Sequence, residues 1–178
     1  MTDPVPTRVG PAGGARAARI MPPVRRGGGQ PRPDFFIPGA PKSGTSSMYE
    51  YLRQHPEIYL PSLKEPRHFC PDQDSGSDRD GLFFVRDRDE YLALYAGVRG
   101  EKRIGDASVQ YLYSRVAAER IREFNPDARF IVMLRNPVHM AYSLHGQRLA
   151  GGGEDIEDFG EALEAEADRR EGRRLPKV

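Results

Sequence analysis

The chain alternates between short continuous apolar runs and longer stretches with apolar residues at helical spacing. Residues 35–37 read Phe-Phe-Ile and are followed by Pro38 and Gly39, and residues 129–134 read RFIVML. Runs of this length that end at turn residues predict strands. The second run is apolar enough to predict a strand buried on both faces of a parallel sheet, so we expect an α/β fold.

Helical spacing of apolar residues occurs between and after these two runs. The pattern predicts helices over residues 43–54, 89–97 and 114–124, and a further helix after residue 153 that includes Ile156, Phe159 and Leu163. Prolines at positions 56, 61 and 66 exclude a continuous helix there and predict an extended, irregular segment. Residues 71–90 are mostly polar and acidic, which predicts an exposed loop.

The first 33 residues differ in composition from the rest of the chain. They combine arginines with many Gly, Pro and Ala residues and contain few apolar side chains to bury. We expect a disordered basic leader over residues 1–33, followed by one domain over residues 34–178. The sequence contains no apolar run long enough for a signal peptide or a membrane span.

Charge and cysteine content restrict the classes of partner. The net charge of +1 over 178 residues gives no general attraction to nucleic acid or anionic membranes, so we expect no nucleic-acid partner. The single cysteine, Cys70, excludes an internal disulfide and favours a reducing cytoplasm. The four histidines lack zinc-ligand spacing and the acidic loop does not match a calcium loop, so we expect no metal.

The segment PGAPKSGTSS, residues 38–47, joins the first predicted strand to a helix. The first N–H groups of a helix have no partner, and the positive end of its dipole lies there, so such a junction binds anions. The segment supplies flexible backbone at Gly39 and Gly44, an ammonium at Lys42, and hydroxyl donors at Thr45, Ser46 and Ser47. We expect it to bind a phosphate or a sulfate ester.

A second junction follows the run at residues 129–134. Arg135 offers a planar fork of donors to a phosphate. Asn136 suits a helix N-cap and Pro137 the first helical position. Both junctions lie at the carboxyl ends of predicted strands, where doubly wound folds bind their ligands.

These two motifs resemble those of the sulfotransferases that use 3′-phosphoadenosine-5′-phosphosulfate (PAPS). Their first loop reads PKSGTT or PKTGTT after a short strand, and their second motif is R-x-P followed by a serine, here Arg135 and Ser143. The resemblance implies a P-loop-like three-layer α/β/α fold with a central parallel sheet, and PAPS as co-substrate without a metal. The implied cofactor-binding residues are Lys42, Ser43, Gly44, Thr45, Ser46, Ser47, Arg135 and Ser143, of which the last two would bind the 3′-phosphate.

The segment KEPRHF, residues 64–69, resembles the KEPHFF segment of family members that modify glycans, with one residue inserted. The resemblance implies that Glu65 is the catalytic base, since a carboxylate that takes the acceptor's proton makes a hydroxyl or an amine nucleophilic. Pro66 is expected to hold Glu65 in an extended conformation. His68 is the alternative base, because a histidine has this role in members that act on phenols and alcohols.

Residues 102–113, KRIGDASVQYLY, resemble a family segment that lines the acceptor cleft. Asp106 matches its acidic residue and is a candidate for acceptor binding. Val109 stands where proline is usual, and Ala107 where glycan-modifying members have lysine. The resemblance therefore implies no catalytic lysine at this position.

The resemblance covers residues 34–170, the amino-terminal two thirds of the usual domain, so we expect a C-terminally incomplete domain. The predicted activity is transfer of a sulfuryl group from PAPS to a hydroxyl or an amine of a carbohydrate or glycolipid, with catalysis by Lys42, Glu65 and His68. A catalytically silent nucleotide-binding module is the alternative. A kinase-like P-loop enzyme is disfavoured, because Lys42 precedes the second glycine of the loop instead of following it.

Overall fold

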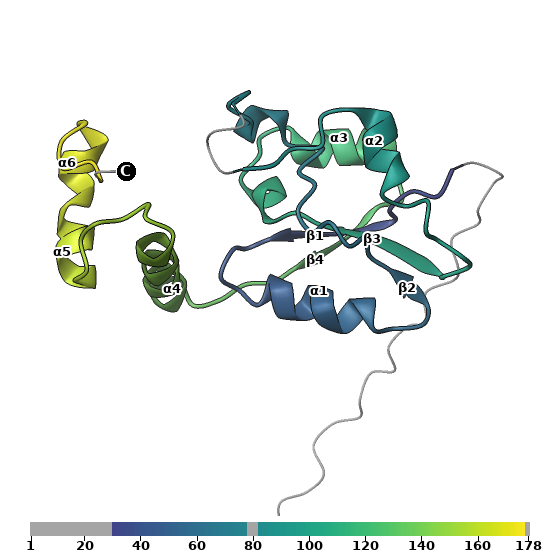
Figure 1. Cartoon of the computed structure of the whole chain (residues 1–178), viewed down its shortest axis with the longest axis horizontal. Helices are drawn as coiled ribbons and strands as arrows, with labels where there is room; N and C mark the ends of the chain where they lie inside the picture. The colour runs from purple at the N-terminus through teal and green to yellow at the C-terminus, as the bar shows by residue number, and fades with distance from the viewer. Residues whose placement is uncertain (1–29, 78–81, 177–178) are drawn as a thin grey trace, which may run out of the picture.

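A parallel four-stranded sheet forms the centre of the protein, whose computed structural model describes residues 30–77 and 82–176. The strand order is β2 (Ile58–Tyr59), β3 (Arg103–Ala107), β1 (Phe35–Gly39) and β4 (Arg129–Val132). β1 pairs in parallel with both β3 and β4, and β3 pairs in parallel with β2. The strand that precedes the first motif therefore lies between two neighbours (Figure 1).

Helices cover both faces of this sheet. Helix α1 (Thr45–Arg53) lies along one face, and α2 (Arg88–Ala93) and α3 (Ala117–Phe124) lie over the other (Figure 1). Two short 3₁₀ turns, η1 (Pro71–Gln73) and η2 (Val109–Leu112), belong to the connecting segments. The predicted α/β/α arrangement with a central parallel sheet is confirmed.

The alternation of side chains along β1 divides the core into two parts. Phe35 and Ile37 pack with Tyr49 of α1, whereas Phe36 packs on the opposite side with Phe69 and other aromatic residues. Successive residues of a strand point to opposite faces, so a continuous apolar run fills both parts. All five residues of β1 are buried.

The prediction that the second apolar run forms a buried strand is wrong. β4 is an edge strand in the described part of the chain, and all four of its residues are exposed. Phe130 keeps 47% of its surface exposed, although its ring lies 5.9 Å from that of Phe36. An apolar run indicates that a strand suits burial, but burial depends on neighbours that come from elsewhere in the chain.

The first three predicted helices form, with shifted ends. α1 begins at Thr45, two residues later than predicted, because Gly44 adopts a left-handed conformation (φ 85°) as its N-cap. α2 ends at Ala93, before the predicted end at residue 97, and α3 begins at Ala117, where the hydroxyl of Ser114 accepts the Ala117 N–H. The local sequence predicted the presence of these helices more accurately than the positions of their ends.

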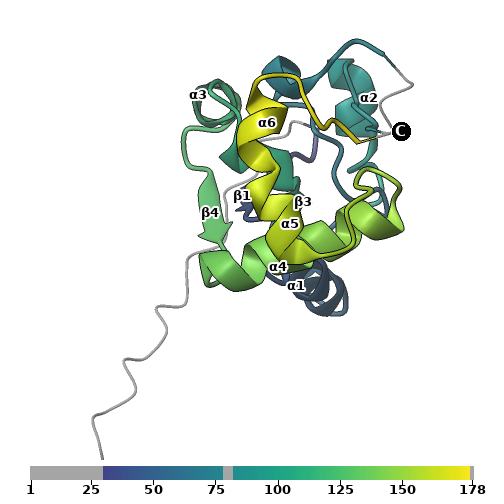
Figure 2. The same cartoon turned by 90° about the vertical axis from the view of Figure 1, so that its left-hand side faces the viewer.

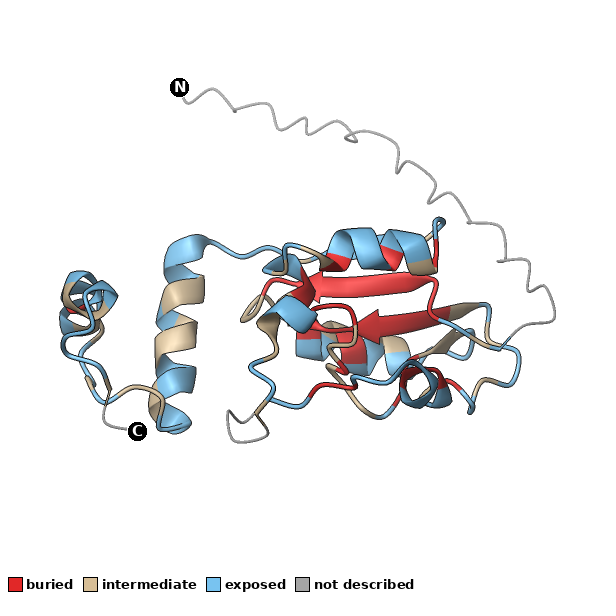
Figure 3. Ribbon diagram, turned by 90° about the horizontal axis from the view of Figure 1, so that it is seen from above, coloured by how far each residue is buried: buried red, intermediate tan, exposed pale blue. Residues whose placement is uncertain are grey.

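Three further helices, α4 (Pro137–Ala150), α5 (Phe159–Glu164) and α6 (Glu166–Arg170), stand beside the sheet and its covering helices (Figures 1 and 3). The helix predicted to include Ile156 begins only at Phe159, so Ile156 precedes it. Arg169 of α6 donates two hydrogen bonds to Glu154, at 2.6 and 2.7 Å, and these lower the pKa of Glu154 to about 2. This ion pair links α6 to the segment that follows α4.

The predicted leader lies outside the described residues, except for residues 30–33. Within those four, Pro33 is fully buried and its carbonyl accepts a hydrogen bond from Asn125. The Arg32 guanidinium donates to the carbonyl of Phe124 at 3.0 Å. Arg32 and Pro33 of the predicted leader therefore contact the domain. None of the helices described is both long and apolar enough to cross a membrane.

Replacing Phe36 with alanine is expected to destabilise the fold far more than replacing Phe130, its register partner on β4. Phe36 is fully buried, so its loss should lower the free energy of unfolding by about 3–5 kcal/mol. The loss at half-exposed Phe130 should be about 1 kcal/mol, from the ring pair. The chain contains no tryptophan, so urea unfolding is followed by circular dichroism. Equal losses would contradict the exposed position of β4.

Candidate functional site

Three chain segments meet where the parallel strands end. In a parallel sheet all carboxyl ends lie at one edge, so the segments that follow β1, β3 and β4 emerge together. The pairing of β1 with β4 continues past the strands: the Ala40 N–H donates to the Met133 carbonyl at 2.7 Å, and the Met133 N–H donates to the Gly39 carbonyl at 2.9 Å. These two hydrogen bonds hold the first and second motifs side by side.

The first motif wraps tightly from β1 into α1. Lys42 (φ 57°) and Gly44 (φ 85°) both have left-handed backbone conformations, and no side chain caps the helix. The first helical hydrogen bond runs from the Met48 N–H to the Gly44 carbonyl, so the N–H groups before it have no acceptor within the helix. The first turn contains no acidic residue. This helix end is therefore a place where an anion can bind.

The second motif has the cap that its sequence predicts. The Asn136 side chain accepts hydrogen bonds from the N–H groups of Val138 and His139, and Pro137 occupies the first position of α4. The preceding residue, Arg135, donates from its guanidinium to the backbone carbonyl of Lys42 at 3.0 Å. The structure thus brings the arginine of the second motif into contact with the loop of the first.

Lys42 and Arg135 concentrate positive charge at this edge of the sheet. Within residues 30–77 and 82–176, neither side chain forms an ion pair with a carboxylate. The nearby end of α1 adds the positive pole of its dipole. An anion with more than one negative charge would need groups of this kind.

The remaining predicted donor-binding residues differ in accessibility. Ser46 and Ser47 are exposed at the start of α1, whereas Thr45 is buried, and the Ser43 hydroxyl donates to the carbonyl of Pro41 at 3.3 Å. Ser143 lies in α4, about 9 Å along the helix from its first residue. No hydrogen bond in the described part of the chain joins Ser143 to Lys42 or Arg135.

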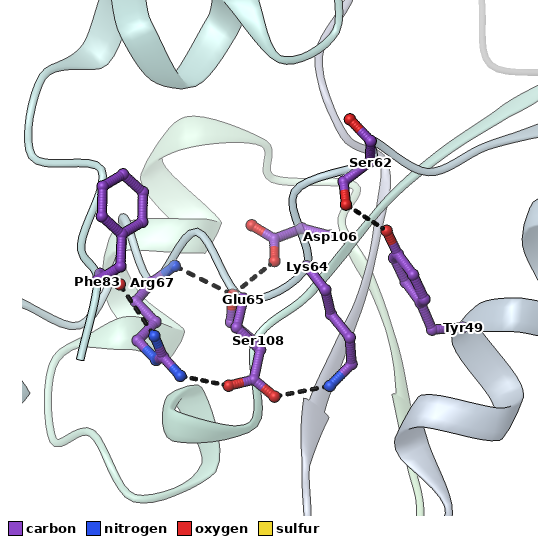
Figure 4. A network of polar contacts seen from close by, with 8 residues as sticks. All are labelled: Tyr49, Ser62, Lys64, Glu65, Arg67, Phe83, Asp106 and Ser108. Carbon is purple, nitrogen blue, oxygen red and sulfur yellow. Dashed lines mark hydrogen bonds and ion pairs between the residues drawn. The ribbon is translucent and has the colours of Figure 1, made fainter. Parts of the chain in front are cut away.

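Glu65 lies at the carboxyl end of β3. Its N–H donates to the carbonyl of Ala107, the last residue of that strand, at 3.0 Å. One carboxylate oxygen of Glu65 lies 2.7 Å from the Lys64 ammonium and the other lies 2.5 Å from the Arg67 guanidinium (Figure 4). The side chain remains 19% exposed, so the carboxylate is held in place but accessible.

The prediction that Pro66 holds Glu65 in an extended conformation is wrong. Glu65 has φ 60° and Arg67 has φ 55°, so both residues beside the proline are left-handed. A following proline disfavours the right-handed helical region, and Glu65 avoids that region by adopting a positive φ instead of an extended conformation. The Pro66 carbonyl accepts the Val85 N–H at 2.8 Å, which ties the turn to the loop before α2.

His68, the alternative base, lies among aromatic residues. Its ring stacks on Tyr91 with centroids 4.4 Å apart and meets the edge of Phe69 at 4.9 Å. The Nδ1 atom lies 2.8 Å from the Val85 carbonyl oxygen, which accepts only from a protonated nitrogen. Burial lowers the pKa of His68, so its ring is neutral at neutral pH and Nε2 is the acceptor.

Asp106 does not lie where an acceptor molecule could reach it, contrary to expectation. It is fully buried, and three hydroxyl groups donate to its carboxylate: Tyr91 at 2.7 Å, Tyr111 at 2.9 Å and Ser108 at 2.9 Å. Burial raises the pKa of Asp106 to about 6, although these hydrogen bonds oppose the shift. Sequence reasoning missed this network, because the tyrosine hydroxyls that surround Asp106 come from apolar positions of two elements, α2 and η2, which give no sign of a shared carboxylate.

Other types of catalytic group find no support in the described residues. Burial raises the pKa of Cys70 to about 12, so its thiol stays protonated and is a poor nucleophile. No cluster of three or more His, Cys, Asp or Glu side chains is placed to hold a metal ion within residues 30–77 and 82–176. The groups available at the sheet edge are therefore cations, hydroxyl groups and the carboxylate of Glu65.

The chain is similar to a solved structure and to several curated proteins that are named sulfotransferases. The crystal structure of a sulfotransferase from Alicyclobacillus acidocaldarius is 41% identical with a TM-score of 0.70, and the match covers 82% of this chain and 61% of that one. Human carbohydrate sulfotransferase 15 is 32% identical over an alignment of 151 residues, and the match covers 62% of this chain and 26% of the relative. Mouse heparan sulfate glucosamine 3-O-sulfotransferase 6 is 32% identical over 133 residues, 72% of this chain and 34% of the relative.

The chain corresponds to only part of the length of each of these relatives. It spans 26% to 34% of the two curated relatives and 61% of the solved bacterial chain. The profile of the family described as "Sulfotransferase family" matches residues 33–174, which is most of the chain and includes both anion-binding motifs and Glu65. The chain therefore belongs to the sulfotransferase family.

Proposed function

We propose that the protein transfers a sulfuryl group from PAPS to a hydroxyl or an amine of a carbohydrate or glycolipid. The observation that carries this proposal is the contact of the Arg135 guanidinium with the Lys42 carbonyl. It places two cationic residues from different strand ends beside one uncapped helix N-terminus. A donor with a phosphosulfate at one end and a 3′-phosphate at the other needs this kind of site.

Each cationic residue has a separate part in holding the donor. Lys42 and the first N–H groups of α1 stabilise the leaving phosphate oxygen, assisted by the exposed hydroxyls of Ser46 and Ser47. Arg135 binds the 3′-phosphate, for which its planar fork of donors is suited, and Ser143 adds a hydroxyl from α4. In sulfuryl transfer, as in phosphoryl transfer, negative charge develops on the leaving oxygen, so catalysis rests on such fixed positive groups.

Glu65 takes the proton of the acceptor. Its backbone is anchored to the end of β3, next to the strand that leads to Lys42, so base and donor site share the same edge of the sheet. Lys64 and Arg67 each occupy one carboxylate oxygen, but an oxygen has two lone pairs and can also accept from an acceptor hydroxyl. The proton then passes to Glu65 as the new sulfur–oxygen or sulfur–nitrogen bond forms.

The acceptor class is supported by the names of the relatives. Two of them are a carbohydrate sulfotransferase and a heparan sulfate glucosamine 3-O-sulfotransferase. The chain also has the KEP segment that resembles glycan-modifying members. A carbohydrate is therefore the first class of acceptor to test, ahead of simple phenols.

Lys42→Ala is expected to lower the transfer rate about 10²- to 10³-fold, because a preorganised cation at the leaving oxygen is removed. The measurement is transfer of sulfur-35 from labelled PAPS to a panel of glycans and phenols. Lys102→Ala is the matched control, since Lys102 is an exposed lysine that pairs with Glu57 at the opposite end of β3. A Lys42→Ala variant with the rate of the Lys102→Ala variant would exclude the proposed role of Lys42.

Arg135→Ala is expected to weaken binding of 3′-phosphoadenosine 5′-phosphate about 10- to 100-fold, the cost of losing charge-assisted hydrogen bonds. Calorimetry should find no comparable loss for adenosine 5′-phosphate, which lacks the 3′-phosphate. Arg122→Ala, in the exposed face of α3, controls for the loss of one positive charge. Equal losses for both nucleotides would mean that Arg135 does not bind the 3′-phosphate.

The same calorimetry tests the alternative functions. Tighter binding of ATP than of 3′-phosphoadenosine 5′-phosphate would favour a kinase-like enzyme. Tight binding of the latter, without sulfur transfer to any acceptor in the panel, would favour the catalytically silent nucleotide-binding module.

Glu65→Gln is expected to lower kcat about 10²- to 10⁴-fold with little change in donor affinity, because only the proton acceptor is lost. His68→Phe keeps the ring stack on Tyr91 and should keep kcat within about tenfold. Both variants are assayed by sulfur-35 transfer at saturating donor. A large loss in His68→Phe with normal turnover in Glu65→Gln would assign the base to His68.

A further inference from the structure

We propose that Asp106 and Ser108 are positioning residues for Glu65: they fix the backbone turn that carries the base. This inference rests on the proposed function, because it concerns the residue that takes the acceptor's proton. It gives a role to a buried carboxylate that touches neither donor nor acceptor.

A continuous chain of hydrogen bonds connects Asp106 to the turn. The Ser108 hydroxyl donates to one carboxylate oxygen of Asp106 at 2.9 Å and accepts the Arg67 N–H at 3.2 Å (Figure 4). Arg67 in turn donates from its guanidinium to the Glu65 carboxylate and to the carbonyl of Phe83. The buried pair therefore acts on the residue that directly holds the base.

The direction of these hydrogen bonds explains why a carboxylate is needed. Two tyrosine hydroxyls donate to the second oxygen of Asp106, so the first oxygen is the one left for Ser108. A carboxylate only accepts, and it therefore orients the Ser108 proton toward itself and leaves a serine lone pair for the Arg67 N–H. Both Asp106 and Ser108 are fully buried, so water cannot replace either partner.

The turn needs this support because of its backbone conformation. Glu65 and Arg67 are both left-handed although neither is a glycine, and such residues persist only where the surroundings constrain them. Hydrogen bonds to neighbouring segments contribute to the constraint, among them Glu65 N–H to Ala107, Val85 N–H to Pro66, and Arg67 N–H to Ser108. Only the last of these depends on a side chain, so it is the one that a substitution can remove cleanly.

Tyr95 provides a matched control within the same buried cluster. Its hydroxyl donates to that of Tyr91 at 3.2 Å, and Tyr95 is as fully buried as Ser108. Tyr95→Phe therefore removes a buried hydrogen bond of the network without touching the link from Asp106 to Arg67. A role that is only structural predicts similar effects of Tyr95→Phe and Ser108→Ala.

The test compares kcat, donor affinity and unfolding in the full chain carrying Ser108→Ala, Asp106→Asn or Tyr95→Phe. Ser108→Ala and Asp106→Asn are expected to lower kcat on the order of tenfold or more, because a base displaced by a fraction of an ångström loses its alignment. Binding of 3′-phosphoadenosine 5′-phosphate should stay unchanged in both. Tyr95→Phe should keep kcat within about twofold. If all three variants lower kcat in proportion to their loss of stability, the positioning role is refuted.

A double variant separates this inference from the proposed function. Because Ser108 acts through Glu65, adding Ser108→Ala to Glu65→Gln should lower kcat no further. An additional tenfold loss in the double variant would refute the positioning role and leave Glu65 as the base. Normal turnover of Glu65→Gln alone would instead refute the proposed base. Ser108→Thr, which keeps the hydroxyl, should retain a higher kcat than Ser108→Ala.

Discussion

The site depends on the parallel pairing of β1 with a neighbour on each side. That pairing brings the ends of three strands to one edge, and two backbone hydrogen bonds between the segments after β1 and β4 extend it into the loops. Lys42 and Arg135 are 93 positions apart in the sequence, and the pairing is what brings them together in space. With it, the guanidinium reaches the carbonyl of Lys42. The chemistry of the site thus follows from the register of the sheet.

The charges at this edge are arranged in two different ways. Neither Lys42 nor Arg135 pairs with a carboxylate in the described residues, so their positive charge is available to an anionic ligand. Glu65 lies between two cations and Asp106 among three hydroxyls, so the carboxylates already have their partners. The unpaired cations favour an anionic ligand, and the Glu65 carboxylate, paired with two cations, would repel such a ligand less than a free carboxylate. Unpaired cations beside a paired carboxylate suit the proposed reaction, in which an anionic group is transferred.

Local sequence was sufficient to predict the parts of the structure that depend on neighbours in sequence. The strand–loop–helix at residues 35–53 and the Asn136–Pro137 cap each follow from residues that are neighbours in the sequence. The exposure of β4, the left-handed conformation of Glu65 and the burial of Asp106 could not be predicted in this way. Each depends on contacts outside the local sequence: the missing second neighbour of β4 in the described residues, the Ala107 carbonyl beside Glu65, and Tyr91 of α2 beside Asp106.

The proposed base and the proposed donor site follow different strands, and this restricts how an acceptor could approach them. Glu65 is anchored to β3 through Ala107, whereas Lys42 follows β1, and the two strands are locked by the pairing of Ile37 with Ala107. The sheet therefore sets the separation between the Glu65 and Lys42 backbones. Under the proposed function, an acceptor hydroxyl has to reach both residues at once, so the strands constrain where it reacts while the surrounding loops select which molecule carries it.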